Sequence, residues 1–175
     1  MRIIETTDKG FSEILSGITG RGETDTSAVE PAVRDIIDSV RQDGDRALAY
    51  YTKKFDGVDI AGRIEVKRSE IDAAMRKVSK KNLSLIEFAA DRIEDFHRKQ
   101  VRNSWFTTSA DGTLLGTRIT PLERAGIYVP GGKASYPSTV LMNAIPARVA
   151  GVDSVVMVTP PGKDAIAPHV LASAR

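Results

Sequence analysis

The fold of this chain is decided by residues 126–152, which read GIYVPGGKASYPSTVLMNAIPARVAGV. The stretch begins as a short apolar strand, turns at its paired glycines and continues as an apolar helix. A second strand is predicted at 155–158, where four apolar, mostly β-branched residues precede a Thr-Pro-Pro turn. Strand, crossover helix and strand make one βαβ unit of a parallel sheet. Ligands of such sheets bind beyond the carboxyl ends of the strands, so Pro130-Gly131-Gly132 is the candidate ligand loop.

Two standard nucleotide-binding motifs do not describe this loop. The Walker pattern requires a glycine at the position of Ile127 and a Ser or Thr at the position of Ala134. The dinucleotide fingerprint G-x-G-x-x-G is absent because Gly131 and Gly132 are adjacent. Spacing alone therefore leaves two interpretations open, a ligand loop or glycines that only turn the chain tightly.

The residues before this unit are predicted to be mainly helical. Residues 1–25 form an arm with a short strand-like start and an amphipathic segment around Phe11. Ser27 and Glu30 have the spacing of a capping box, which predicts a helix from there to about residue 44. Another helix is expected to follow at once and to end at residues 56–57. Its inward-pointing side chains are predicted to be Leu48, Tyr51 and Phe55.

The helical pattern continues as far as residue 100. Residues 64–67 alternate as a brief strand, and Ser69 is predicted to open a third helix. A fourth and longer helix is expected over about 80–100. One face of it is predicted to carry the apolar side chains Leu85, Phe88, Ala89, Ile93 and Phe96.

The hydrophobic period then changes from that of a helix to that of strands. Residues 104–108 and 113–119 flank Asp111-Gly112, a strong hairpin signal. The ribbon is expected to lead into the βαβ unit, with a domain boundary at 121–124. The predicted fold class is therefore α/β, with a helical N-terminal region and a hairpin that lead into an incomplete Rossmann-like parallel βαβ unit. We divide it into an arm (1–25), a helix-rich first domain (26–122) and the start of a Rossmann-like domain (123–175).

Composition excludes several classes of protein. The 25 Lys and Arg residues and 23 Asp and Glu residues leave a net charge of +2, and no basic stripe with interleaved aromatics indicates nucleic-acid binding. The absence of cysteine excludes disulfides and thiolate metal sites. The N-terminus becomes charged too soon for a signal peptide, and no apolar run is long enough to span a membrane. These features predict a cytoplasmic protein that binds neither nucleic acid nor membranes.

Four runs of sequence identify a protein family more specifically than the spacing of their glycines does. They are VRQDGDRAL at 40–48, YTKKFDG at 51–57, GIYVPGG at 126–132 and YPSTVLMNAIPARVAG at 136–151. In this order they resemble the histidinol dehydrogenase family, NAD-dependent and zinc-containing enzymes of the last steps of histidine biosynthesis. The resemblance covers essentially the whole chain, and family members are far longer. It implies that the chain is the N-terminal portion of such an enzyme, with 123–175 as the truncated start of the NAD-binding domain.

The resemblance implies cofactor contacts at four residues. Tyr128 matches a tyrosine that contacts NAD, and Pro130 and Gly131 line the same turn. Phe55 matches a residue that closes on the cofactor from the first domain. The residues themselves leave alternatives open, since Tyr128 also suits a half-buried strand aromatic and Phe55 suits a core position.

The chain offers little of the chemistry that oxidation of an alcohol requires. A base must take the hydroxyl proton, yet the two histidines, His97 and His169, lack partners at metal-ligand spacing and suit surface or helix-end positions. The resemblance places the zinc ligands and a Glu-His acid/base pair after residue 175. No catalytic or metal-binding residue is therefore assigned, and residues 1–175 alone are expected to be inactive.

The implied function is two successive NAD-dependent oxidations of L-histidinol, through L-histidinal to L-histidine, by a homodimer. Two alternatives stay open: a non-catalytic nucleotide-binding or oligomerisation module, and an unrelated Rossmann-like nucleotide-binding enzyme. The reading frame after Arg175 distinguishes the enzyme from the module, because only the enzyme needs a zinc-binding and Glu-His segment there.

Overall fold

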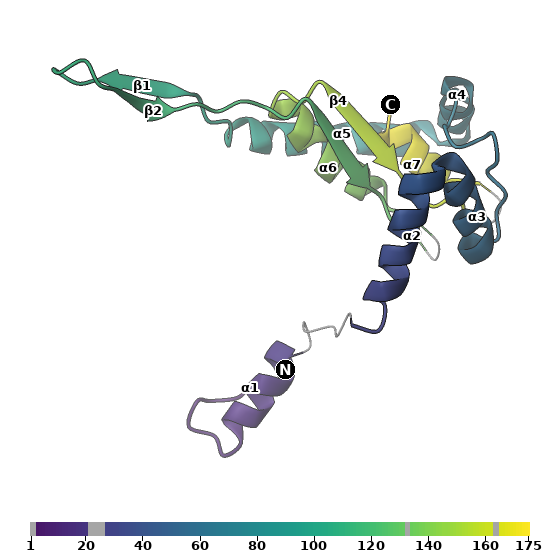
Figure 1. The fold of residues 1–175 in the computed structure, drawn as a ribbon, viewed down its shortest axis with the longest axis horizontal. Helices are drawn as coiled ribbons and strands as arrows, with labels where there is room; N and C mark the ends of the chain where they lie inside the picture. Colours follow the sequence, from purple (N-terminus) through teal and green to yellow (C-terminus); the bar gives the residue numbers. More distant parts are fainter. Residues whose placement is uncertain (1–2, 21–26, 132–133, 163–164) are drawn as a thin grey trace. The chain divides into compact units, whose positions relative to one another are not determined.

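The structure, a computed structural model, describes residues 3–20, 27–131, 134–162 and 165–175 (Figure 1). The chain divides into two compact units, Met1–Leu48 and Ala49–Arg175. The predicted order of helices, hairpin and βαβ unit is confirmed. The predicted domain boundary at 121–124 stays a prediction. No helix among the residues described combines the length and the apolar character needed to cross a membrane.

The first unit consists of helices with little core of their own. Helix α1 spans Phe11–Thr19 and α2 spans Glu30–Asp43, and neither contains a buried residue. Helix α2 begins later than the predicted start at Ser27, because Val29 is the N-cap, and the side chain of Val29 makes no capping hydrogen bond. A proline in the first turn explains the later start, since a first-turn proline loses no helical hydrogen bond.

Helix α3, Asp45–Asp56, crosses from the first unit into the second, where α4 (Arg68–Lys77) and α5 (Lys80–Arg98) follow. Residues 64–67 do not form the predicted strand. Helix α4 also begins before the predicted start at Ser69. The reason is that the Lys67 N–H donates to the Glu70 carboxylate at 2.9 Å, which makes Lys67 the N-cap.

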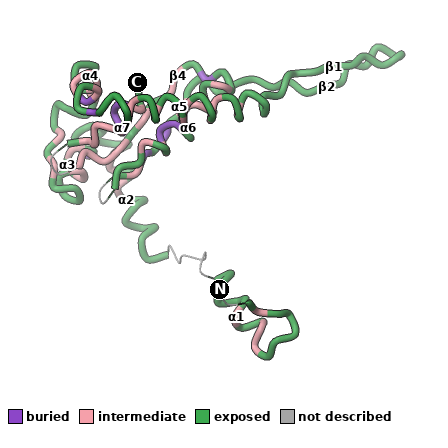
Figure 2. Tube along the Cα trace, turned by 180° about the vertical axis from the view of Figure 1, so that it is seen from behind, coloured by how far each residue is buried: buried purple, intermediate pink, exposed green. Residues whose placement is uncertain are grey.

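The hairpin forms where the sequence predicts it. Strands β1 (Trp105–Thr108) and β2 (Leu114–Thr117) pair antiparallel. In the turn the Thr113 N–H donates to Asp111 Oδ1 at 3.0 Å, and Gly112 has a φ of 87°, a conformation that favours glycine. Every strand residue of this ribbon is exposed, as the green tube of Figure 2 shows.

The βαβ unit consists of β3 (Arg124–Tyr128), α6 (Pro137–Val149) and β4 (Ser154–Val158), followed by the short helix α7 (Pro168–Ser173). The strands are parallel and in register from Arg124 opposite Ser154 to Tyr128 opposite Val158. The Val129 N–H donates to the Val158 carbonyl at 2.9 Å and extends this ladder by one bond.

The core lies where this unit meets α7. Val129, Val140 and Val170 form a buried cluster, and Met157, Ile166 and Ala167 pack against it. Helix α6 contacts both strands, and α5 and α7 contact α6 in turn (Figure 1). The strands, the crossover helix and α7 therefore share one core.

The packed face of α5 differs from the predicted one. Leu85, Phe88 and Phe96 are each more than half exposed, so their prediction as packed positions is wrong, whereas Ala89 and Ile93 are half-buried. Apolar side chains surround most of this helix, so periodicity alone does not select the stripe that packs. Additional half-buried positions on the helix are Leu83, Ile86 and Ala90.

Candidate functional site

Tyr128 is the last residue of β3 and lies at the carboxyl end of the strand. Its neighbours Ile127 and Val129 are buried, and since side chains alternate along a strand, Tyr128 lies on the opposite face. Its side chain is 61% exposed. The alternative of a half-buried strand aromatic is therefore wrong, and the ring is accessible to a ligand.

Three further residues share the face of the sheet that carries Tyr128. Gly126 lies two residues earlier, and Val156 and Val158 stand opposite Gly126 and Tyr128 in β4. Both valines are exposed, and a Cβ built on Gly126 would meet nothing within 4 Å. We call these four residues the Tyr128 face. It is an open, apolar surface that a flat ring can cover.

The loops after the two strands lie close to each other. Pro130 is half-buried, Gly131 is exposed, and a Cβ built on Gly131 would lie 3.4 Å from Cδ of Pro160. Gly132, the last residue of the predicted ligand loop, lies outside the described residues. Pro160 is absent from the predicted site, although it follows β4 as directly as Pro130 follows β3. The structure thus brings Tyr128, Pro130 and Gly131 together and adds Pro160 beside them.

Helix α6 begins beyond this loop. Its N-cap is Tyr136, no side chain caps it, and its first turn contains no acidic residue. The free N–H groups of a helix N-terminus favour anions. The local electrostatics beyond the loop are therefore compatible with a phosphate-bearing ligand.

Phe55 lies on α3, and within the described residues no hydrogen bond or ring contact joins it to the turn after β3. Its side chain is 63% exposed, so the alternative of a core residue is wrong, and Leu48 is exposed as well. The ring stacks on Tyr51, with centroids 6.0 Å apart and planes 6° from parallel. Exposure leaves the ring free to meet a ligand.

Both histidines lie in terminal turns of helices. His97 Nδ1 lies 2.7 Å from the Gln100 amide oxygen, and His169 Nε2 lies 3.1 Å from the Asn82 amide nitrogen. Across the described ranges, no group of three or more His, Asp or Glu side chains is placed to hold a metal ion. These residues do not fit a zinc site, and no chemical step through zinc is derived from them.

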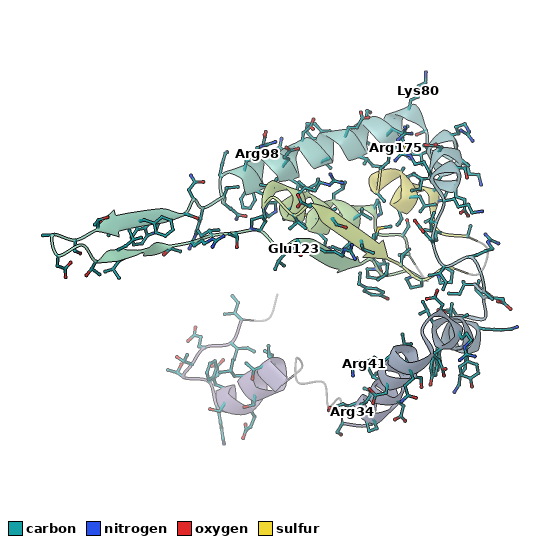
Figure 3. All side chains as sticks on the ribbon, turned by 45° about the horizontal axis from the view of Figure 1, so that its top comes forward. Arg34, Arg41, Lys80, Arg98, Glu123 and Arg175 are labelled. Atoms are coloured by element: carbon teal, nitrogen blue, oxygen red, sulfur yellow. The ribbon has the colours of Figure 1, made fainter. Side chains whose placement is uncertain are left out.

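A cavity of about 590 Å³ lies on the opposite side of the sheet from the Tyr128 face. Ile127, Val155 and Met157 line it from the strands, and Arg98 and Arg175, labelled in Figure 3, line it from α5 and from the end of the chain. Arg98 is paired with Glu94, and Arg175 Nη1 lies 3.1 Å from Asp72 Oδ1. This cavity is therefore separate from the predicted ligand loop.

Comparison with known proteins gives one consistent family. A family model described as histidinol dehydrogenase matches residues 19–175. The histidinol dehydrogenase of Syntrophotalea carbinolica is 50% identical over the whole chain, and that of Geobacter sulfurreducens is 46% identical, also over the whole chain. The crystal structure of histidinol dehydrogenase from Elizabethkingia anophelis superimposes with a TM-score of 0.74 at 31% identity, over 99% of this chain and 36% of that one. The chain spans 41% of the length of the two curated relatives.

Proposed function

Because the chain belongs to the histidinol dehydrogenase family, we propose that it forms the N-terminal part of an enzyme that oxidises L-histidinol to L-histidine with NAD. The observation that carries this proposal is the 50% identity to a histidinol dehydrogenase over the whole chain. Since the chain spans 41% of that relative, we assign the activity to the longer polypeptide, with residues 1–175 alone inactive.

The proposed reaction removes two hydrides from one carbon atom. NAD would accept the hydride in each oxidation, first from the alcohol carbon of L-histidinol and then from the hydrated aldehyde carbon of L-histidinal. The hydroxyl proton of the alcohol, and the two protons that the hydrate releases as it becomes the carboxylate, would go to bases, which we assign to residues outside this chain. A binding surface must hold the nicotinamide against the carbon in both steps.

We assign part of that binding surface to Tyr128, Pro130, Gly131 and Phe55. The exposure of Tyr128 at the carboxyl end of a parallel strand supports its role, because this is where ligands of such sheets bind. The apolar Tyr128 face can pack against one side of a planar ring. The exposed ring of Phe55 supports a second contact from α3. We assign zinc to residues outside this chain.

We also propose a cytoplasmic homodimer with the domain division at residue 122. The dimer is supported by the exposed apolar side chains of the hairpin and of α5, which are typical of surfaces that another protein covers. Sedimentation equilibrium of the full-length enzyme tests the dimer, and a mass of one chain at micromolar concentration would contradict it.

The experiment that tests the function measures NADH formation from histidinol and NAD by the full-length enzyme and its Tyr128→Ala variant. One aromatic contact contributes about 0.5–1.5 kcal/mol, so we expect the variant to bind NAD roughly three- to tenfold more weakly. Because Tyr128 is exposed, the melting temperature should change little.

A matched control is Phe106→Ala, which removes a similarly exposed aromatic ring from the hairpin. It should leave the NAD constant unchanged. An unchanged NAD constant in Tyr128→Ala would remove Tyr128 from the site. If the full-length protein forms no NADH from histidinol, the proposed function is contradicted. If residues 1–175 alone turn over histidinol, their proposed inactivity is contradicted.

A further inference from the structure

Three Asp-Gly bonds occur in the chain, and the aspartate and the glycine are exposed at each of them. They are Asp43-Gly44 at the end of α2, Asp56-Gly57 at the end of α3 and Asp111-Gly112 in the hairpin turn. At such a bond the aspartate side chain can close onto the backbone nitrogen, because glycine has no side chain to hinder the approach. Exposure does not distinguish the three bonds, so the contacts of each aspartate decide which one reacts.

The hairpin turn restrains Asp111 on both sides of the bond. The Thr113 N–H donates to Asp111 Oδ1 at 3.0 Å, and the Gly112 N–H donates to the Ser109 carbonyl at 3.0 Å. The Thr113 N–H and then its side chain hold the pKa of the Asp111 carboxyl below its ordinary value. An ionised carboxylate is a poor target for a nucleophile. Both the carbon to be attacked and the nitrogen that would attack it are therefore protected.

Asp43 is restrained by a cation and by two helices. Arg46 Nη2 donates to Asp43 Oδ1 at 2.7 Å. The Gly44 N–H donates to the Val40 carbonyl at 2.8 Å, and the Gly44 carbonyl accepts the Leu48 N–H at 3.1 Å, because α3 follows α2 at once. The N-terminus of α3 also favours a nearby negative charge. The carboxylate and the glycine backbone are therefore both held in place.

Asp56 lacks these restraints. Within the described residues no hydrogen bond or ion pair engages its carboxylate. It is the last residue of α3, where a negative charge is unfavourable, and closure to a neutral ring removes that charge. The Gly57 N–H donates to the Lys53 carbonyl at 3.1 Å, but residues 58–67 form no helix or strand. Because the last turn of a helix frays, this bond to the backbone opens readily.

One side-chain contact spans the Asp56-Gly57 bond. Lys53 Nζ donates to Asp59 Oδ2 at 3.0 Å, which joins the last turn of α3 to the loop after it. Both side chains are more than half exposed, and an ion pair on the surface contributes little to stability. This contact therefore does little to prevent fraying of the helix end.

We propose that Asp56-Gly57 is a site of spontaneous modification, where aspartate isomerises to isoaspartate in preference to the other two Asp-Gly bonds. The Gly57 nitrogen forms a bond to Cγ of Asp56, and the side-chain hydroxyl leaves as water with the amide proton, which gives a succinimide ring. Water then adds to the main-chain carbonyl carbon of the ring, and the bond from this carbon to the nitrogen breaks. The backbone now runs through Cγ, the former main-chain carbonyl is a free carboxylate, and the mass of the chain is unchanged.

The test measures isoaspartate at all three bonds in one sample of the full-length protein, aged for weeks at neutral pH. Peptide mapping with electron-transfer fragmentation distinguishes isoaspartate from aspartate at each position. We expect about tenfold more isoaspartate at Asp56 than at Asp43 or Asp111, because only those two carboxylates keep a hydrogen-bond partner.

Two variants show whether the contacts are the cause. Asp56→Glu should abolish the product at this position, because a glutamate side chain would have to close a larger and slower-forming ring. Arg46→Gln removes the partner of Asp43 and should raise isoaspartate there by about two- to fivefold, while the amount at Asp56 stays the same. The melting temperature should change little in both variants, because both side chains are exposed.

Equal amounts of isoaspartate at the three bonds would overturn the proposal, as would a larger amount at Asp43 or Asp111. An isolated peptide of residues 51–61, aged in parallel, is the positive control for the chemistry. If the peptide isomerises and the full-length protein contains no isoaspartate at Asp56, the proposal is also overturned. None of these results depends on histidinol oxidation.

Discussion

The βαβ unit and the hairpin belong to the same compact unit of the chain, yet different forces determine their structures. In the βαβ unit the side chains Val129, Val140 and Val170 are buried against one another. In the hairpin the apolar side chains stay more than half exposed: Trp105, Phe106, Leu114 and Leu115. The hairpin instead depends on the local chemistry of its turn, and isolated two-stranded ribbons have marginal stability. Packing therefore stabilises one region and turn geometry shapes the other.

Two matched leucines give the largest expected contrast. Leu141 in α6 is 7% exposed and Leu115 in β2 is 59% exposed. We expect Leu141→Ala to lower the free energy of unfolding by roughly 2–5 kcal/mol, because it loses buried area and leaves a cavity. Leu115→Ala should change it by less than about 0.5 kcal/mol. Urea unfolding checks both variants, and equal losses would show that the hairpin is packed in solution.

Two matched glycines test the hairpin by adding side-chain atoms instead of removing them. A Cβ on Gly116 would lie 2.2 Å from the carbonyl oxygen of Trp105 and 2.6 Å from Cδ1 of Phe106, so the strands must separate. We expect Gly116→Ala to destabilise the ribbon by about 1–3 kcal/mol. Gly126→Ala in β3 should be tolerated within about 0.5 kcal/mol, because its Cβ meets nothing within 4 Å. Amide hydrogen exchange across β1 and β2 measures the loss of pairing, and slow exchange in Gly116→Ala would refute the expected separation.

The smallest expected effect is the pH dependence of the turn. Hydrogen bonds from the Thr113 N–H and then its side chain lower the pKa of Asp111 below its ordinary value. The ionised carboxylate therefore stabilises the hairpin above the pKa of the unfolded chain, and this stabilisation disappears as pH falls through the lower pKa of the folded state. We expect the Thr113 amide resonance to shift and broaden below about pH 4. Asp111→Asn should abolish this transition, and its persistence would assign it to another group.

Local signals in the sequence predict the hairpin and the βαβ unit well. Asp111-Gly112 defines the turn by itself, and alternation between Ile127 and Val129 is enough to place Tyr128 on the other face. The face of α5 was not predictable in this way, because Leu85 and Ala90 are both apolar and only the position of α6 decides which of them packs. The predictions for Tyr128, Pro130, Gly131 and Phe55 as cofactor contacts came from family resemblance rather than from periodicity.

Helix starts show a second limit. Ser69 was a reasonable N-cap by residue type, but Lys67 is the N-cap because the Glu70 side chain accepts its backbone N–H. An N-cap residue whose own side chain does not cap the helix cannot be identified from the sequence by looking for Ser, Thr, Asp or Asn. Pro160 was missed for a related reason, since its importance comes from its closeness in space to Gly131, which lies 29 positions earlier in the chain.

Gly131 and Pro160 lie close enough that a side chain at position 131 would meet the proline ring, which makes these two positions interdependent in any mutational library. A methyl group at position 131 would meet Cδ of the proline ring at 3.4 Å, which is an ordinary van der Waals contact, so alanine fits there while the further atoms of a larger side chain must avoid the ring. Replacements that fail singly can therefore succeed as pairs. Laboratory evolution of this loop toward other cofactors should randomise both positions together, because a search of position 131 alone samples only the residues that the proline tolerates.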